Sequence, residues 1–176
     1  MLSIFKPTWM LESAYHLQPD NLKARGYKAI LTDLDNTLIA WDDKHLTERA
    51  LVWIDDLQSS GIPVIVISNN TKGRVHVATQ QLDSPVIASA KKPFKFGLKQ
   101  ALNLVDVPKS EILLVGDQMI TDVIGANRIG IDVALVKPLV ESDAWNTKLN
   151  RYIESKILNY LMKKNPEMKW SQSLHE

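Results

Sequence analysis

The chain has 176 residues, of which 45% are apolar and 23% are charged, with 21 basic residues against 20 acidic ones. This is the size and composition of a single globular domain with a hydrophobic core. The balance of charge gives no reason to expect binding to nucleic acid. The absence of cysteine excludes disulfides, thiolate catalysis and thiolate metal ligands.

The N-terminal segment 1–26 contains charged residues and prolines, including Lys6, Pro7 and Glu12, and lacks the apolar core of a signal peptide. No stretch of the sequence approaches the roughly 18 consecutive apolar residues of a membrane-spanning helix. We therefore expect a cytoplasmic protein with a single domain over 1–176. In this domain 1–26 is an N-terminal extension, 27–140 is the core and 142–164 is a basic C-terminal helix.

From residue 27 onward, short apolar runs alternate with longer amphipathic segments. The apolar runs predict strands, and these cover 27–32, 62–68, 85–89, 111–117 and 131–136. The amphipathic segments predict helices, and these cover 46–61, 71–82, 92–105, 118–130 and 142–164. In the first helix Thr47 is the expected N-cap and Gly61 the stop signal, while Pro93 lies near the start of the third helix. This alternation predicts an α/β fold with a parallel sheet that is covered on both faces.

Ligands bind at the carboxyl ends of the strands in such a sheet. The residues that directly follow the predicted strands are Asp33, Asp35, Ser68, Asn69, Lys91, Lys92, Gly116 and Asp117. Carboxylates, a hydroxyl and amines at one edge of a sheet are suited to phosphate chemistry. The candidate site is therefore placed there.

The segment TDLDNTL carries two carboxylates, Asp33 and Asp35, which would lie on one side of an extended chain. One such carboxylate can attack a substrate while the other transfers protons. A turn rich in Asp and Asn explains this segment equally well, so it does not decide the function by itself.

The next two segments are ambiguous when taken alone. Ser68 follows an apolar strand, and its hydroxyl and the following N–H groups, such as that of Asn69, can hold phosphate oxygens. A simple helix cap is the more common use of such a serine. Lys92 offers an ammonium group that can neutralise phosphate charge, but most lysines are simply solvated, and the neighbouring Lys91 is an equal candidate.

The segment LLVGDQMITDV adds two more carboxylates, Asp117 and Asp122, after a glycine that we expect to allow a tight turn, Gly116. Together with Asp33 and Asp35 they would gather about four negative charges, which a partly buried site does not tolerate without cations. Mg²⁺, a hard cation that prefers oxygen ligands, is the usual partner of phosphate sites. The sequence therefore predicts a magnesium site at these four carboxylates.

The motifs DLDNT, ISNN, KKP and GDQMITD resemble, in order and type, the four motifs of the haloacid dehalogenase (HAD) superfamily. The resemblance covers about residues 27–136, which we take to be the whole sheet. It implies a Rossmann-like three-layer α/β/α fold. The gaps of about 30 residues before Ser68 and about 20 residues before Lys92 leave no room for a cap domain, so we expect an open, capless site.

The resemblance implies a phosphatase mechanism. Asp33 would attack phosphorus and form an aspartyl phosphate, and Asp35 would protonate the leaving oxygen and then activate water. Thr37 would support the turn and Asp35, while Ser68 and Lys92 would bind the phosphoryl group. An acid at position 35 is typical of HAD phosphatases and argues against dehalogenases and P-type ATPases.

The resemblance also implies the ligands of Mg²⁺. Asp33, Asp117 and the backbone carbonyl of Asp35 would bind the ion, and Asp122 would act through water or by holding Lys92. Cations and positioning would then stabilise the charge that spreads over the phosphoryl oxygens.

The closer resemblance is to the YqeG-like branch of HAD subfamily IIIA, and it rests on the segment PTWMLESAYHLQPDNLKARGYKAILTDLDNTL followed by AWDD. Related mitochondrial enzymes dephosphorylate phosphatidylglycerophosphate, so this lipid is the expected substrate. Soluble small-molecule or protein phosphates are the alternative. A second subunit that covers the open site is compatible with the sequence as well.

Two other classes of protein share parts of this pattern. A signalling receiver domain also uses an Asp, a Ser/Thr and a Lys before Pro, but its acidic pair comes from a strand well before the phosphorylated Asp, and 1–32 shows no such strand. A HAD-fold assembly protein with vestigial activity is less consistent with a complete set of catalytic residues.

The predicted C-terminal helix is basic. Between Thr147 and Lys164, five basic residues oppose the single acid Glu154, and an apolar stripe is expected from Leu149, Ile153, Ile157, Tyr160 and Leu161. Such a helix can lie on an anionic membrane, which suggests a peripheral membrane contact. Packing on the sheet with a solvated basic face is the simpler alternative.

Overall fold

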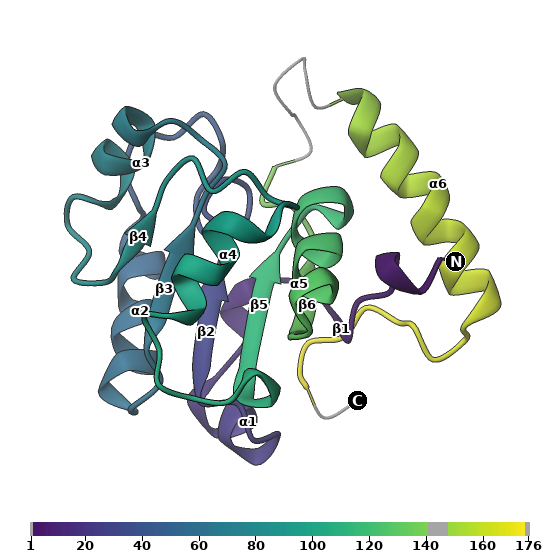
Figure 1. The fold of residues 1–176 in the computed structure, drawn as a ribbon, viewed down its shortest axis with the longest axis horizontal. Coiled ribbons are helices and arrows are strands. Elements are labelled where there is room, and N and C mark those ends of the chain that lie inside the picture. Colours follow the sequence, from purple (N-terminus) through teal and green to yellow (C-terminus); the bar gives the residue numbers. More distant parts are fainter. Residues whose placement is uncertain (1, 141–147, 175–176) are drawn as a thin grey trace.

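A six-stranded sheet forms the centre of the computed structural model, which describes residues 2–140 and 148–174. All neighbouring strands are parallel, in the order β1-β6-β5-β2-β3-β4 (Figure 1). The strands are β1 Trp9–Leu11, β2 Ala29–Thr32, β3 Val64–Ile67, β4 Val86–Ile87, β5 Ile112–Gly116 and β6 Asp132–Val136. The predicted parallel α/β sheet is thereby confirmed.

Helices cover both faces of this sheet. They are α1 Pro19–Ala24, α2 Glu48–Ser59, α3 Lys72–Thr79, α4 Lys95–Leu102, α5 Ile124–Ile129 and α6 Lys148–Lys164, with a π-helical turn, η4, at Met119–Val123. Successive strand side chains point to opposite faces, so Ile30 joins a core with α1–α3 while Leu31 joins a second core with α4–α6. The result is the three-layer α/β/α fold that the sequence predicted.

The N-terminal extension contributes a strand that the sequence analysis missed. β1 pairs with β6, with Trp9 opposite Ala134, so the sheet extends beyond 27–136 and the predicted limit is wrong. β1 lies at the edge of the sheet and has only three residues, which is too short a segment to show a periodic pattern. The C-terminal tail lies beside it, since the N–H of Glu12 donates to the carbonyl of Ser171 at 2.9 Å.

The ends of several helices follow the predicted signals. The Thr47 hydroxyl accepts from the N–H of Ala50 at 3.2 Å, and Gly61 after α2 has a φ of 83°. The predicted helix at 118–130 is instead two pieces, η4 and α5, and it ends at Gly130 with a φ of 74°. α4 begins at Lys95, after Pro93 rather than at it.

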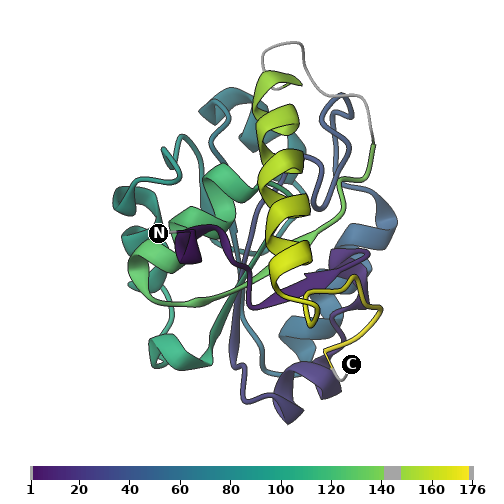
Figure 2. The same ribbon diagram turned by 90° about the vertical axis from the view of Figure 1, so that its right-hand side faces the viewer.

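The C-terminal helix α6 stands along one side of the molecule, beside the N-terminal segment (Figure 2). Leu161 is buried and Ile157 packs against the second core, so this helix covers the sheet. The predicted apolar stripe is partly wrong, because Ile153 and Tyr160 are 42% and 49% exposed. Residues 142–147 of the predicted helix and the side chain of Leu149 lie outside the described part of the chain.

Within residues 2–140 and 148–174, no helix combines the length and the apolar character that crossing a bilayer requires.

Candidate active site

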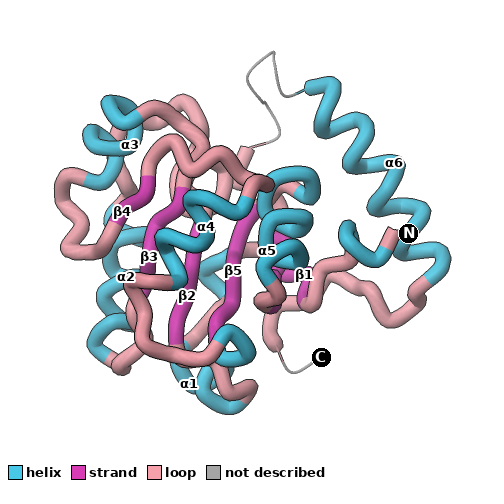
Figure 3. The backbone as a smooth tube through the Cα atoms, in the orientation of Figure 1, coloured by secondary structure: helices cyan, strands magenta, loops and turns pink. Residues whose placement is uncertain are grey.

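Loops leave the carboxyl ends of the strands at one edge of the sheet (Figure 3). Most of the candidate residues lie on these loops, whereas Gly116 ends β5 and Asp122 lies in η4. β2 lies between β5 and β3, so the segment after it is central. The N–H of Asp33 donates to the carbonyl of Val115 at 2.8 Å, which holds this segment against β5. The chain then turns at Asn36, whose φ of 62° is a conformation that asparagine tolerates.

Lys92 is buried in the centre of the site. Its Nζ atom lies 2.6 Å from Oδ1 of Asp33 and 2.7 Å from Oδ1 of Asp122. Burial lowers the pKa of Lys92, but the carboxylates of Asp122 and Asp33 outweigh this effect and raise the pKa above its ordinary value. The adjacent Lys91 is exposed, so the geometry distinguishes the two lysines that the sequence left open.

The loop of Lys92 is fixed by Asn69. The side-chain oxygen of Asn69 accepts from the Lys92 N–H at 2.6 Å, and its amide nitrogen donates to the Lys92 carbonyl at 2.9 Å. Ser68 is buried, and its hydroxyl accepts from the N–H of Asn70 at 3.0 Å. The Asn69 side chain thus holds the backbone of Lys92 from both its N–H and its carbonyl.

Three carboxylates form an acidic cluster, since Asp33, Asp117 and Asp122 each place an oxygen within 4.8 Å of the others. Burial raises the pKa of Asp117 to about 6, against the opposing effect of Arg151. Burial also raises the pKa of Asp33 well above its ordinary value, against the opposing effect of Lys92. Buried carboxylates that lie this close together are stabilised by a divalent cation that prefers oxygen ligands, so this set of donors fits Mg²⁺.

The Asp35 carboxylate does not join this cluster. Its Oδ1 lies 2.9 Å from Nη2 of Arg74, and its Oδ2 accepts from Nδ2 of Asn70 at 3.4 Å. The expected gathering of four carboxylates is therefore corrected to three. The alternation of side chains that suggested it applies within a strand, whereas β2 ends at Thr32 and the chain turns at Asn36.

The structure gives Thr37 and Gly116 specific contacts. The Thr37 hydroxyl donates to Oδ1 of Asp117 at 3.3 Å, so it links two of the motifs. Its N–H donates to the carbonyl of Leu34 at 3.4 Å, within the turn that Thr37 was expected to support. Gly116 lacks the positive φ of a tight turn, and that part of the prediction is wrong. A Cβ atom at Gly116 would lie 2.3 Å from Cγ of Asp122, so this glycine leaves room for the buried carboxylate.

Sequence reasoning missed two arginines that contact the candidate carboxylates. Arg74 pairs with Asp35, and its place in the first turn of the helix after ISNN was a signal that could have indicated it. Arg151 in α6 contacts both the carboxylate and the backbone carbonyl of Asp117. It lies 34 residues from Asp117, and no motif marks it.

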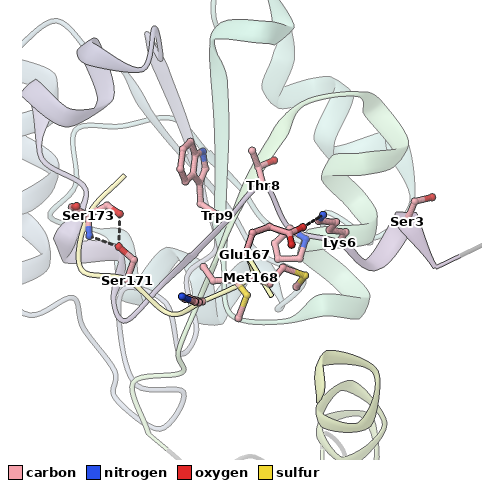
Figure 4. Close-up of a pocket in the computed structure, with 11 residues that line it drawn as sticks. Ser3, Lys6, Thr8, Trp9, Glu167, Met168, Ser171 and Ser173 are labelled. Carbon is pink, nitrogen blue, oxygen red and sulfur yellow. Dashed lines mark hydrogen bonds and ion pairs between the residues drawn. The ribbon is translucent and has the colours of Figure 1, made fainter. Parts of the chain in front are cut away.

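A separate cavity of about 510 Å³ lies between the N-terminal segment and the C-terminal tail (Figure 4). Thr8, Trp9 and Met168 line it, and the ion pair of Lys6 with Glu167 spans 2.8 Å at its wall. None of the candidate catalytic residues lines this cavity, so it is not part of the site.

The fold and the site together define a hydrolase of the HAD type. A sequence model of the HAD-hydrolase-like family matches residues 89–161. The chain is 36% identical, over 96% of its length and 97% of the other, to "Probable phosphatase YqeG" of Bacillus subtilis. It therefore belongs to the YqeG-like phosphatases of the HAD superfamily.

Solved structures agree with this fold. An uncharacterized protein from Listeria monocytogenes serotype 4b has a TM-score of 0.52 at 17% identity, with 78% of this chain and 99% of that chain covered. A haloacid dehalogenase-like hydrolase from Brucella suis 1330 has a TM-score of 0.51 at 14% identity, with coverages of 73% and 93%. At these identities the likeness concerns the fold alone.

Proposed function

We propose that this phosphatase is a magnesium-dependent phosphomonoester hydrolase that works through an aspartyl phosphate on Asp33. The observation that carries the proposal is the buried Lys92, which bridges Asp33 and Asp122 beside the three-carboxylate cluster. We also propose that 1–176 forms one hydrolase domain, because β1 and α6 pack on the sheet that carries the site.

In the proposed reaction, an oxygen of Asp33 bonds to phosphorus while the bond to the leaving oxygen breaks. Asp35 gives its proton to that oxygen, and it later takes a proton from the water that hydrolyses the aspartyl phosphate. The ion pair with Arg74 orients the Asp35 carboxylate and holds it apart from the acidic cluster. Ser68 and Lys92 bind the transferred phosphoryl group.

Asp33, Asp117 and the backbone carbonyl of Asp35 would hold Mg²⁺, which when bound neutralises phosphoryl oxygens. The contact of Asp122 with Lys92 at 2.7 Å supports the role of Asp122 as the residue that holds the lysine. Thr37 would keep Asp117 in place through its hydroxyl.

We further propose phosphatidylglycerophosphate as the substrate. Only α2 and β3 lie between Asp33 and Ser68, and only α3 and β4 lie between Ser68 and Lys92, so no cap inserted there limits the size of the leaving group. Apolar side chains near the catalytic segments are exposed, namely Trp41 at 36%, Phe94 at 66% and Leu139 at 39%. Exposed apolar side chains of this kind suit an amphiphilic phosphate better than a sugar phosphate.

The outer face of α6 supports a peripheral contact with an anionic membrane. Tyr152 and Ile153 are exposed there at 62% and 42%, and Lys156 and Lys163 are exposed as well. Aromatic and basic side chains of this kind are favoured at the membrane interface.

The test is phosphate release with Mg²⁺ from phosphatidylglycerophosphate in mixed micelles, p-nitrophenyl phosphate, sugar phosphates and nucleotides. Wild type is compared with Asp33→Asn. Release from the lipid that Asp33→Asn abolishes is the expected result. Release from soluble esters alone would keep the mechanism and exclude the lipid. Equal release by both proteins would exclude Asp33 as the nucleophile, and no release by folded wild type would favour an assembly role.

A further inference from the structure

The first turns of α6 reach into the acidic cluster, although this helix lies outside the motifs of the site. Nη1 of Arg151 donates to the carbonyl of Asp117 at 2.8 Å, and Nη2 of Arg151 contacts Oδ2 of the same residue. The side chain of Asp117 is fully buried and that of Arg151 is 19% exposed. Arg151 therefore makes a partly buried, two-point contact with a residue whose carboxylate is proposed to bind Mg²⁺.

Glu154, one turn further along α6, contacts a second acidic segment. Its carboxylate is 7% exposed and accepts from the N–H of Ile120 at 2.8 Å. Ile120 lies in η4, the turn that also carries Asp122. α6 is thus attached to the segments of both Asp117 and Asp122.

Arg151 and Glu154 both make polar contacts at this end of α6. A cavity of about 190 Å³ lies beneath it, lined by Met119, Leu135, Pro138, Leu158 and Trp170 as well as by Asp117, Arg151 and Glu154. Apolar packing is therefore incomplete next to the Arg151–Asp117 contact. The ion pair and hydrogen bonds of Arg151 and Glu154 therefore help to hold this end of the helix.

The oxygens of Asp117 are both engaged by the protein, Oδ1 with Thr37 and Oδ2 with Arg151. A divalent cation bound to Asp117 would stand close to the guanidinium group, and like charges in a partly buried site repel strongly. The cluster of Asp33, Asp117 and Asp122 is already balanced in part by Lys92 and Arg151. A bound cation and Arg151 are thus alternative partners of one carboxylate.

We propose that Arg151 acts on the metal site through Asp117, by competing with the divalent cation for this carboxylate. This inference rests on the proposed magnesium site. Because binding free energies are reciprocal, a cation that weakens the Arg151–Asp117 contact also weakens the attachment of α6. The C-terminal helix then reports the metal occupancy of the site.

The test is calorimetric titration of the full chain with Mg²⁺, and with Mn²⁺ as a second probe. Arg151→Gln should bind the ion at least about fivefold more tightly than wild type. The matched control Lys163→Gln, at an exposed position of the same helix, should bind as wild type does. Unchanged or weaker binding by Arg151→Gln would overturn the proposal.

Asp117→Asn separates this inference from the proposed function. If it binds the ion as wild type does, the magnesium site itself is wrong. If it loses binding while Arg151→Gln binds as wild type does, the site stands and the competition fails.

Hydrogen exchange of the wild-type chain gives a second measurement that needs no variant. Saturating Mg²⁺ should increase the exchange of α6 amides relative to those of α4. Equal or slower exchange in α6 with Mg²⁺ would count against the displacement of Arg151.

Discussion

The ammonium group of Lys92 lies 2.6 Å from the Asp33 carboxylate, which carries the proposed nucleophilic oxygen. The lysine side chain is 2% exposed, and its second partner, Asp122, is fully buried. One buried cation therefore compensates two buried carboxylates that belong to different motifs. Removing one member of such a group leaves uncompensated charge in a medium that solvates it poorly.

Lys92→Met should lower the free energy of unfolding by about 3–5 kcal/mol in the absence of divalent ions. Mg²⁺ should restore part of this loss, since it would compensate the same carboxylates. Urea unfolding with EDTA and with Mg²⁺ measures both effects. The control is Lys91→Met at the exposed neighbouring position, which should change stability by less than about 0.5 kcal/mol. Equal stability of the two variants would contradict the buried bridge.

Gly116→Ala should destabilise the protein by about 1–3 kcal/mol, because the added methyl group would overlap the Asp122 carboxyl and push it away from Lys92. Phosphate release should fall as well. Gly73→Ala in α3 is the matched control, since its Cβ would meet no atom within 4 Å. That change should stabilise the helix by up to about 1 kcal/mol. If the two variants unfold alike, the packing of Asp122 against Gly116 is not what requires glycine.

The central part of the fold was predictable because buried parallel strands are continuous apolar runs. β2, β3 and β5 contain such runs, and the residues that follow them meet at one edge of the sheet. The edge strand β1 was not predictable in this way, since three residues that follow a proline show no period. Its place in the sheet is decided by pairing with β6, which is a tertiary contact.

In the site, too, some residues were predictable from the sequence and others depend on tertiary contacts. Motif order placed Asp33, Lys92 and Asp117 together, because each follows a strand of one sheet. Arg74 and Arg151 could not be assigned from the motifs, since their partners are fixed by the direction of side chains across separate elements. The apolar stripe predicted for α6 was partly wrong for the same reason, since the packing of the helix decides which of its side chains are buried.

Arg74→Gln should reduce kcat by on the order of 10²-fold, with a smaller change in KM, because Asp35 would lose the partner that orients it. Arg74→Lys should recover part of the activity, since it keeps the charge without the second donor. Steady-state kinetics on the best substrate of the panel distinguish the two parameters. Lys72→Gln, at an exposed position of the same helix, is the control. A loss in KM alone would assign Arg74 to substrate binding rather than to Asp35.

Glu154 should make stability depend on pH. Burial raises the pKa of Glu154 from 4.5 to about 7, although the hydrogen bond from the Ile120 N–H opposes the shift. Between these values the folded state binds more protons than the unfolded state, so the contribution of Glu154 to stability falls as pH rises through this window.

Glu154→Gln should remove this dependence, while its amide oxygen still accepts from Ile120. From pH 5 to pH 8 in EDTA, the variant should gain stability relative to wild type, by on the order of 2 kcal/mol. Urea unfolding of both proteins at each pH measures the difference. A constant difference across this range would mean that Glu154 titrates alike in the folded and unfolded chains. A difference that shrinks with rising pH would mean that folding lowers the pKa of Glu154 instead of raising it.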